Sequence, residues 1–490
     1  MEKRRQKLIF EYIETGANTS RFVSDCDVPT TDLAAYYGDR YRQQSLDFPD
    51  LAEIEVIRHY TNNSLSNYGV ENGPYPLGSC TMKYNPKVNE AMANLPGFTD
   101  THPLQPVETV QGNLKLLYLL EHQLNDLLGM DAFTFQPAAG AHGELTGIMM
   151  IKAYHEQRGD TARKVMLIPD SAHGTNPASA AMAEFEVREL KSNELGLVDI
   201  DDLKSKLGPE VAGIMLTNPN TLGLFEKDVL EITRLVHECG GLNYYDGANF
   251  NAILMQCRPG DMGFDVVHLN VHKTFSTPHG GGGPGAGPVG VKEHLKPFLP
   301  KPVVTYCDDS DLYRLDYDRP HSIGKVRAFS GSFGIFVRTY AYILAYGKTG
   351  LSEVSQAAVA NANYLKARLK DYYEVPYTSD AMHEFIMTSK RQREYGVHTM
   401  DIAKRLIDFG YHPPTIYFPL IVSEAMMIEP TETETLEGLD GLVDAFIAIA
   451  KEVETDVSKL QSAPHYGSIT RPDEVKAAKQ AIVKYQAKDQ

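Results

Sequence analysis

A lysine between an apolar run and a string of glycines is the residue best suited to covalent chemistry. Lys273 follows residues 266–271, which read as a buried strand, and precedes the glycine-rich run 280–288. Partial desolvation favours the neutral amine of a lysine, the form that attacks an aldehyde to give a Schiff base. Glycines let a backbone approach a ligand and present N–H groups to phosphate oxygens. The alternative is a solvated lysine on a flexible loop. A Walker-type phosphate loop is excluded, because the lysine precedes the glycines.

An aspartate closes another apolar segment of the same region. Asp246 ends the run 242–246 and is expected to be buried, which is costly for a carboxylate without a partner. A protonated pyridine nitrogen is one possible partner, and the ion pair would make the ring a strong electron sink. A capping or salt-bridged structural aspartate is the alternative. Together, Asp246 and Lys273 favour pyridoxal phosphate (PLP), which carries both an aldehyde and a pyridine ring.

Two further turns are compatible with the same ligand. Residues 136–144 are small and lead into a helix, whose N-terminal N–H groups favour a phosphate. An ordinary glycine-rich turn is the alternative. Residues 170–177 follow a strand and contain His173, which could lie flat on an aromatic ring or only hydrogen-bond locally.

These turns must be positioned by a regular alternation of strands and helices. Strands are predicted at 164–169, 211–216, 242–246 and 266–271, and helices at 110–128 and 226–239. Such alternation predicts an α/β fold with parallel βαβ units and a sheet covered on both faces. Ligands of open α/β sheets bind outside the carboxyl ends of the strands, where all four candidate turns lie.

The chain is long enough for more than one domain. We expect an N-terminal arm over residues 1–60, a large domain over 61–345 and a smaller C-terminal α/β domain over 346–490. Residues 60–110 are rich in Asn, Gly, Pro and Tyr and are predicted to be mostly loop.

Composition excludes several other classes of function. The net charge of −17 disfavours non-specific binding to nucleic acid or to an anionic membrane, because like charges repel. No apolar run is long enough to span a bilayer, and no signal peptide is recognised. The five cysteines are scattered and odd in number, which favours reduced thiols and a cytoplasmic location.

The sequence resembles a known family, the P-protein of the glycine cleavage system, which is a PLP-dependent glycine dehydrogenase (decarboxylating). The resemblance runs nearly end to end. The motifs that carry it lie at residues 75–86, 171–178, 216–221, 270–275, 419–422 and 427–434. Single-chain members are about twice as long, and the match is to their C-terminal half. Residues 136–142 look like the bacterial two-subunit form, in which this chain would be subunit 2.

The resemblance implies the PLP-dependent transferase fold of type I, similar to aspartate aminotransferase, and a role for each matching residue. Lys273 looks like the Schiff-base lysine, Asp246 like the partner of the pyridine nitrogen and His173 like the histidine that stacks on the ring. The remaining cofactor-binding residues would be Thr217 and Asn218 near the phenolic oxygen, Gly140, Ala141 and His272 around the phosphate, and Ala248 beside Asp246. No metal ligand is expected.

The resemblance also implies the reaction and the partners. Glycine would be decarboxylated, and its aminomethyl group would pass to the lipoyl arm of H-protein. Subunit 1 would be a separate chain, and the two would form a heterotetramer. The proton carrier would be Lys273 or His173. Another amino acid decarboxylase, an aminotransferase or a non-catalytic structural subunit remain alternatives on the same fold.

Overall fold

The structure is a computed structural model that describes residues 7–12, 27–44, 49, 51–280, 285–467 and 469–483. Residues 281–284 of the predicted glycine-rich run, Cys26 and parts of the predicted N-terminal arm lie outside these ranges. The chain divides into two compact units, one formed from residues 1–72 with 464–490 and the other from residues 73–463. The predicted boundaries at residues 60 and 345 stay predictions.

The first unit is helical in its described parts. Its longer elements are α1 (Leu33–Tyr37), α2 (Glu53–Ser64) and α16 (Glu474–Lys479). The side chains of Asp32 and Asp473 accept backbone N–H groups at the starts of α1 and α16, as helix N-caps do.

The second unit contains a seven-stranded sheet with the strand order β1-β7-β6-β5-β4-β2-β3. Strands β2 to β6 are parallel to one another, whereas β7 is antiparallel to both β6 and β1. The strands are β1 (Ala132–Thr134), β2 (Val165–Pro169), β3 (Glu186–Leu190), β4 (Val211–Thr217), β5 (Leu242–Gly247), β6 (Val266–Leu269) and β7 (Val289–Val291).

Apolar side chains cover both faces of this sheet. Tyr245 and Val267 belong to one buried cluster, while their sequence neighbours Tyr244 and Val266 belong to another. Because successive side chains of a strand point to opposite faces, the two clusters are the two sides of the sheet. The prediction of an α/β sheet buried on both faces is confirmed.

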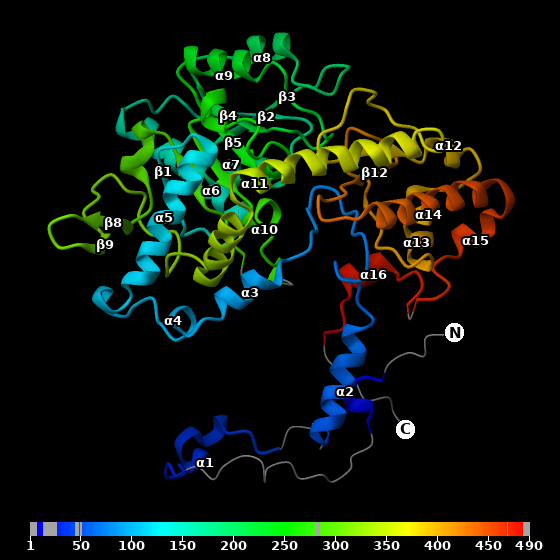
Figure 1. The fold of residues 1–490 in the computed structure, drawn as a ribbon, viewed down its shortest axis with the longest axis horizontal. Helices are drawn as coiled ribbons and strands as arrows, with labels where there is room; N and C mark the ends of the chain where they lie inside the picture. The colour runs from blue at the N-terminus through cyan, green and yellow to red at the C-terminus, as the bar shows by residue number, and fades with distance from the viewer. Residues whose placement is uncertain are drawn as a thin grey trace. The chain divides into compact units, whose positions relative to one another are not determined.

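Helices connect the strands and supply these two layers (Figure 1). They are α5 (Gln111–Leu128), α6 (Gly140–Gln157), α7 (Thr175–Met182), α8 (Ile200–Lys206), α9 (Val229–Glu238) and α10 (Val271–Thr274). The predicted helix over 110–128 is confirmed as α5. The predicted strand over 266–271 ends at Leu269, because Val271 already begins α10, so Lys273 lies in a short helix and not in a loop.

A second sheet lies in the C-terminal part of this unit. Its antiparallel order is β10-β12-β11, formed by β10 (Phe385–Thr388), β11 (Thr415–Ile416) and β12 (Ala425–Ile428). Its helices are α12 (Lys390–Arg393), α13 (Thr399–Asp408), α14 (Leu436–Thr455) and α15 (Val457–Gln461). They enclose a separate apolar core.

A long helical element, kinked at Gly347, connects the two sheets of this unit. α11 (Phe333–Leu369) contacts α3 (Lys87–Ala93) and α5 on the side of the large sheet, and α14 on the side of the small one (Figure 1). The remaining elements are α4 (Pro96–Thr99) and the hairpin of β8 (Val303–Cys307) with β9 (Leu312–Asp316). Among the described residues, no helix has the length and apolar character needed to cross a membrane.

Candidate active site

Three polar residues meet where the parallel strands end. β5 lies between β4 and β6, and the register places Asp246 beside Thr217 on one side and His268 on the other. The Thr217 hydroxyl donates to Asp246 Oδ2 at 3.1 Å, and the N–H of Ala248 donates to Asp246 Oδ1 at 3.0 Å. His268 Nε2 lies 3.5 Å from Oδ1. These contacts fix the carboxylate at the carboxyl edge of the sheet.

The surroundings keep Asp246 ionised although it is only 2% exposed. Burial by itself raises the pKa of Asp246, but His268, the Ala248 N–H and Lys273 together lower it below the ordinary value. His268 is fixed by Tyr244, whose hydroxyl lies 2.5 Å from its Nδ1. An anionic carboxylate in a dry site is suited to pair with a protonated ring nitrogen.

Lys273 lies at the same edge, in the helix that follows β6. It is 6% exposed, and its Nζ donates to the carbonyl oxygen of Ser79 at 2.6 Å. No carboxylate among the described residues forms an ion pair with it. An amine that is buried and held by a single neutral acceptor can be released for covalent chemistry.

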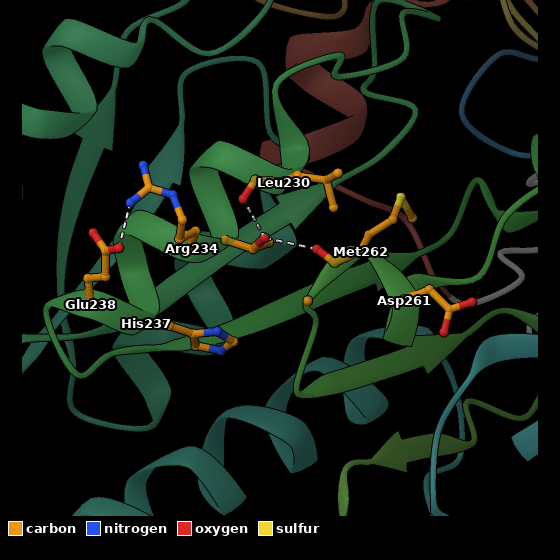
Figure 2. Close-up of a pocket in the computed structure, with 8 residues that line it drawn as sticks. Leu230, Arg234, His237, Glu238, Asp261 and Met262 are labelled. Carbon is orange, nitrogen blue, oxygen red and sulfur yellow. Dashed lines mark hydrogen bonds and ion pairs between the residues drawn. The ribbon is translucent and has the colours of Figure 1, made fainter.

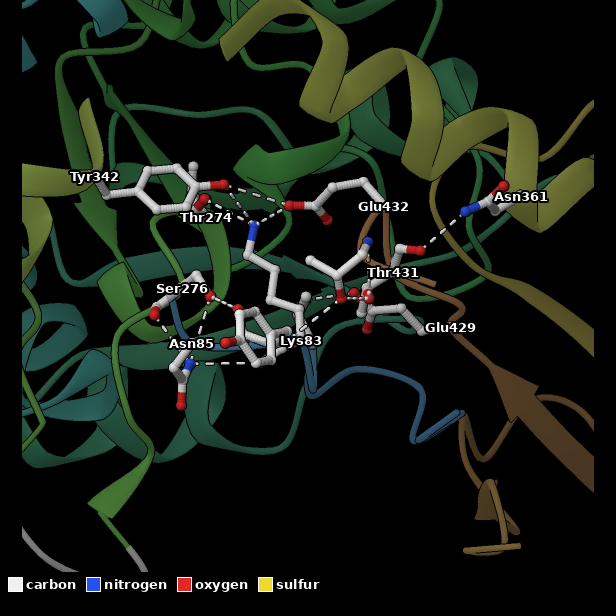
Figure 3. A network of polar contacts seen from close by, with 12 residues as sticks. Lys83, Asn85, Thr274, Ser276, Tyr342, Asn361, Glu429, Thr431 and Glu432 are labelled. Atoms are coloured by element: carbon white, nitrogen blue, oxygen red, sulfur yellow. Dashed lines mark hydrogen bonds and ion pairs between the residues drawn. The ribbon is translucent and has the colours of Figure 1, made fainter. Parts of the chain in front are cut away.

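A network of polar contacts holds the loop of residues 75–84 against this helix (Figure 3). Lys83 Nζ donates to the carbonyl of Thr274 at 2.9 Å and forms an ion pair of 2.5 Å with Glu432. Asn85 Nδ2 donates to the carbonyl of Ser276 at 2.9 Å. The loop and the residue after it are therefore fixed at the C-terminal end of α10, and the Ser79 carbonyl contacts Lys273.

His173 begins the turn after β2. Its Nδ1 lies 3.3 Å from the backbone nitrogen of Thr175 and 3.0 Å from the Thr175 hydroxyl oxygen, so Thr175 holds the ring at this nitrogen. Its ring packs edge-on against Phe418, with centroids 5.6 Å apart. Partial burial lowers the pKa of His173, with Asp246 opposing and Lys273 adding to the effect, so the ring is neutral at neutral pH.

A buried glutamate extends this turn toward the sheet. Glu144 of α6 accepts from the Thr175 hydroxyl at 2.9 Å and from the Ser179 hydroxyl at 3.2 Å. Burial, followed by the charge of Asp246, raises the pKa of Glu144 to about 7. No role was assigned to Glu144 from the sequence, although it is a carboxylate that lies four residues after Gly140, within the first turns of α6.

The start of α6 has the features of a phosphate site. Gly140 is buried, Ala141 is exposed, and no side chain caps this end of the helix. A Cβ at Gly140 would lie 2.1 Å from Asn270 Oδ1, so only glycine lets α6 approach the turn that carries His272 and Lys273 this closely. Burial, with nearby His279, lowers the pKa of His272 to about 3, which keeps it neutral. The uncapped N–H groups, the anionic Asp246 and the amine of Lys273 together match the three reactive ends of PLP.

The structure thus brings together Lys273, Asp246, Thr217 and Ala248. Asn218 is fully buried next to them, with its Oδ1 accepting from the N–H of Glu226 at 2.9 Å. The contact of Thr217 and Asn218 with a phenolic oxygen stays a prediction. Sequence reasoning missed Ser79, which acts through its backbone, and His268, whose only signal is a polar residue within an apolar strand.

A surface pocket elsewhere in this unit contains none of these residues (Figure 2). It is lined by α9 and by the turn η6 (Pro259–Met262), and the Thr233 hydroxyl there donates to the Met262 carbonyl at 2.8 Å. Because α9 and η6 precede β5 and β6, the pocket lies at the amino ends of these strands, opposite the candidate site. It carries no functional assignment.

A sheet of this topology, with an ionised aspartate at the end of one strand and a buried lysine after the next, defines the class of PLP-dependent enzymes of fold type I. Solved structures of other proteins have a similar fold. The inhibitor-bound crystal structure of a glycine decarboxylase (P-protein) of the glycine cleavage system has a TM-score of 0.73 and 20% identity, covering 86% of this chain and 94% of that one. Lactobacillus brevis glutamate decarboxylase has a TM-score of 0.65 and 12% identity, covering 86% and 97%. At these identities the likeness shows the fold alone.

Sequence comparison identifies the particular family. Residues 354–465 match the family model described as glycine dehydrogenase, C-terminal domain. The probable glycine dehydrogenase (decarboxylating) subunit 2 of Caldanaerobacter subterraneus is 58% identical, over 99% of this chain and 100% of that protein. Its namesake in Bacillus licheniformis is 55% identical over the same shares. The chain belongs to the family of glycine dehydrogenase (decarboxylating) subunit 2, and the predicted resemblance is confirmed.

Proposed function

We propose that this chain binds PLP through Lys273 and decarboxylates glycine, with transfer of the aminomethyl group to the lipoyl arm of H-protein. One observation carries the proposal: Lys273 is buried and free of an ion pair among the described residues, at the sheet edge that also holds the ionised Asp246. The names of relatives that match over nearly the whole chain support glycine as the substrate.

The residues that would hold the cofactor come from four strand ends. Lys273 would bind its aldehyde, Asp246 its ring nitrogen and the start of α6, with Gly140 and Ala141, its phosphate, with His272 close to that end. His173 would cover the ring, and Thr217, Asn218 and Ala248 would complete the cradle. When bound, PLP supplies an electron sink for the pair released as carbon dioxide leaves.

The protein's own groups then determine which chemistry occurs. Asp246 stays anionic and would therefore keep the ring nitrogen of the cofactor positively charged. This charge would make breaking a bond to the Cα of glycine less costly. Burial of Lys273 limits water near the reacting carbon and so delays unwanted protonation. His173 is neutral and is held at Nδ1 by Thr175, so Nε2 is the ring nitrogen that would act in the site. Lys273 and His173 both remain candidates for the proton carrier.

The proposal includes the partners and the setting. We infer a separate subunit 1, because the relatives are named subunit 2. We propose that two copies of each chain form a heterotetramer. We also infer that the protein is located in the reducing cytoplasm. The four described cysteines form no disulfide; they are Cys80, Cys239, Cys257 and Cys307.

Exchange of labelled bicarbonate into the carboxyl group of glycine tests the function. The assay contains PLP and lipoylated H-protein, with this chain alone and with subunit 1. We expect exchange when both subunits are present. No exchange in either case, while Lys273 still binds PLP, would refute glycine decarboxylation and favour another decarboxylase or an aminotransferase.

A further inference from the structure

Three ionisable residues that the proposed mechanism does not use are buried beside Lys273. His383 and Glu384 precede β10, and Glu429 follows β12. The antiparallel register pairs Phe385 with Ile428, so the next step along the ladder brings Glu384 and Glu429 together. All three side chains are at most 1% exposed. Buried carboxyl groups are costly unless they are neutral or paired, so their position calls for an explanation.

A single residue of the loop connects this cluster to Lys273. The carbonyl of Ser79 accepts from Lys273 Nζ at 2.6 Å, and the N–H of Ser79 donates to Glu384 Oε2 at 2.8 Å. Ser79 has a left-handed backbone with φ of 61°, which is uncommon for a serine. Two residues on, the Thr81 hydroxyl donates to Glu429. The same loop thus holds the amine of Lys273 and both carboxyl groups.

His383 lies between the two glutamates. Its Nε2 is 3.7 Å from Glu384 Oε1 and 3.9 Å from Glu429 Oε1, and no described residue hydrogen-bonds to either ring nitrogen. Burial, with Lys273 adding, lowers the pKa of His383 to about 3, so the ring is neutral. Both approaches involve the same nitrogen and are longer than a hydrogen bond, so His383 lies beside the two carboxyl groups as a neutral neighbour.

Burial is the main influence on the pKa of each glutamate. Burial, and then the charge of Glu429, raises the pKa of Glu384 well above its ordinary value. Burial also raises the pKa of Glu429 to about 7, with Lys273 and Lys83 opposing. The ionisable groups that face the pair are Lys273 of α10, Lys83 and Cys80 of the loop, and His383 before β10. The two ammonium groups make the cluster a poor site for a metal ion.

We propose that Glu429, coupled through its charge to the neighbouring Glu384, stores the proton of Lys273. It takes up a proton when the Lys273 nitrogen loses its positive charge on bonding to PLP, and it returns the proton when an incoming amine frees the lysine. Glu384 and Glu429 act through Lys273 and are positioning residues. The inference rests on the proposed function only in requiring PLP on Lys273.

The step balances without any further reactant. The Lys273 ammonium, the PLP aldehyde and the Glu429 carboxylate give a neutral imine, one water and the Glu429 carboxylic acid. In the reverse sense, the glycine amine, as its free base, forms the new C–N bond while the bond to Lys273 breaks. The released lysine then takes the proton of Glu429. As an ammonium group it cannot attack again, so the exchange proceeds toward the substrate.

Proton release on PLP binding tests the store directly. PLP is titrated calorimetrically into the full-length apoprotein, with subunit 1 present, in two buffers of different ionisation enthalpy. At about pH 8, Glu429→Gln is expected to release about one proton per site more than the wild type, because the variant has no base to receive it. Glu121→Gln is the matched control, since Glu121 is also buried and accepts one backbone N–H, from Phe133 at 3.0 Å. It should release the wild-type number.

Equal release by the wild type and Glu429→Gln, with PLP bound as judged by its absorbance, overturns the proton store but leaves the proposed function intact. Failure of the wild type to bind PLP removes both. If Glu429→Gln does not fold, the infrared difference spectrum of the wild type replaces it. A carboxylic acid band that grows on PLP binding supports the store, and an unchanged carboxyl region contradicts it.

Discussion

At the scale of single residues, the candidate site depends on opposite charge states in nearly dry surroundings. Asp246 is kept ionised by Thr217, Ala248 and His268, and Lys273 is held by a backbone carbonyl that cannot neutralise it by an ion pair. This contrast distinguishes Lys273 from Lys83, an equally buried lysine whose ammonium is bound to Glu432. The neighbours of each lysine therefore decide which can react.

Replacement of Asp246 by asparagine should remove the anion while keeping the side-chain shape. We expect bicarbonate exchange to fall by about 10²–10³-fold, the usual cost of losing one preorganised electrostatic group. PLP should still bind to Lys273. Asp265→Asn is the control, because Asp265 is also buried but lies at the start of β6, where it accepts from the N–H of Asn243 at 2.7 Å. Similar losses in both variants would contradict the role of Asp246.

Sequence alone identifies part of this site. Lys273 and Asp246 can be predicted because each is a polar residue at the end of an apolar strand, next to small residues. Ser79 and Glu429 cannot, because their roles come from contacts between distant segments of the chain and, for Ser79, from its backbone. His268 is visible only once the register of β5 and β6 is known.

At the scale of elements, the loop of residues 75–84 is fixed by close approach to β12. The N–H of Gly78 donates to the Met427 carbonyl at 3.2 Å, and the Thr415 hydroxyl donates to the Gly78 carbonyl at 2.7 Å. A Cβ at Gly78 would lie 2.6 Å from the Met427 carbonyl oxygen. The small sheet therefore sets the position of the loop that holds Lys273.

Gly78→Ala should displace this loop. We expect a loss of about 1–3 kcal/mol in the free energy of unfolding, the usual cost of overpacking, together with weaker PLP binding. Denaturant unfolding and PLP titration measure the two effects. Gly97→Ala is the control, since a Cβ at Gly97 meets nothing within 4 Å. A variant of Gly78 as stable as that of Gly97 would disprove the close packing.

The junction between β12 and α13 predicts a pH effect on stability. Glu424 accepts from the N–H of Thr399 at 3.0 Å and from the Ser389 hydroxyl at 3.2 Å, and His398 Nδ1 lies 3.0 Å from its Oε1. Burial opposes ionisation, but these bonds outweigh it and lower the pKa of Glu424 to about 2. A depressed folded-state pKa stabilises the fold above the unfolded value, and this contribution is lost as the pH falls toward the folded value.

Glu424→Gln should therefore destabilise the protein at neutral pH by about 1–3 kcal/mol. The difference from the wild type should narrow as the pH falls below about 4. Denaturant unfolding over this range measures it. A difference that does not change with pH would show that Glu424 contributes through shape and not through charge.

The local pattern of apolar residues predicts the helices and strands but not where they end or bend. The leucine spacing of α5 and the apolar runs of β2, β4 and β5 are found close to their predicted bounds. The end of β6 was misplaced, because Val271 is apolar in a helix as it would be in a strand. α11 consists of two helices that meet at a kink at Gly347, whose φ of 59° and ψ of −174° are not helical, and no sequence pattern indicated this kink.

At the scale of the whole molecule, the first unit exposes an apolar surface that calls for a partner. Ile54, Ile57 and Tyr60 of α2 are all more than half exposed and are spaced three residues apart, so they share one side of the helix. An exposed apolar stripe of this kind marks an interaction site. We propose that this side of α2 binds subunit 1, the partner that the name of the relatives implies.

The double variant Ile54→Asp with Ile57→Asp should weaken this association without unfolding the chain. Light scattering of the chain mixed with subunit 1 should show a loss of the larger species, while circular dichroism stays unchanged. Leu230→Asp is the control, because Leu230 is also exposed but lies on α9 of the other unit. Assembly unaffected by the double variant would exclude α2 from the interface.

The most direct test of the account is to locate the cofactor on the chain. The protein is incubated with PLP, reduced with borohydride, digested and analysed by mass spectrometry. The account predicts one modified peptide, with the adduct on Lys273, and no adduct in Lys273→Ala. An adduct on Lys83, or no stable adduct at all, would contradict the assignment of the active site.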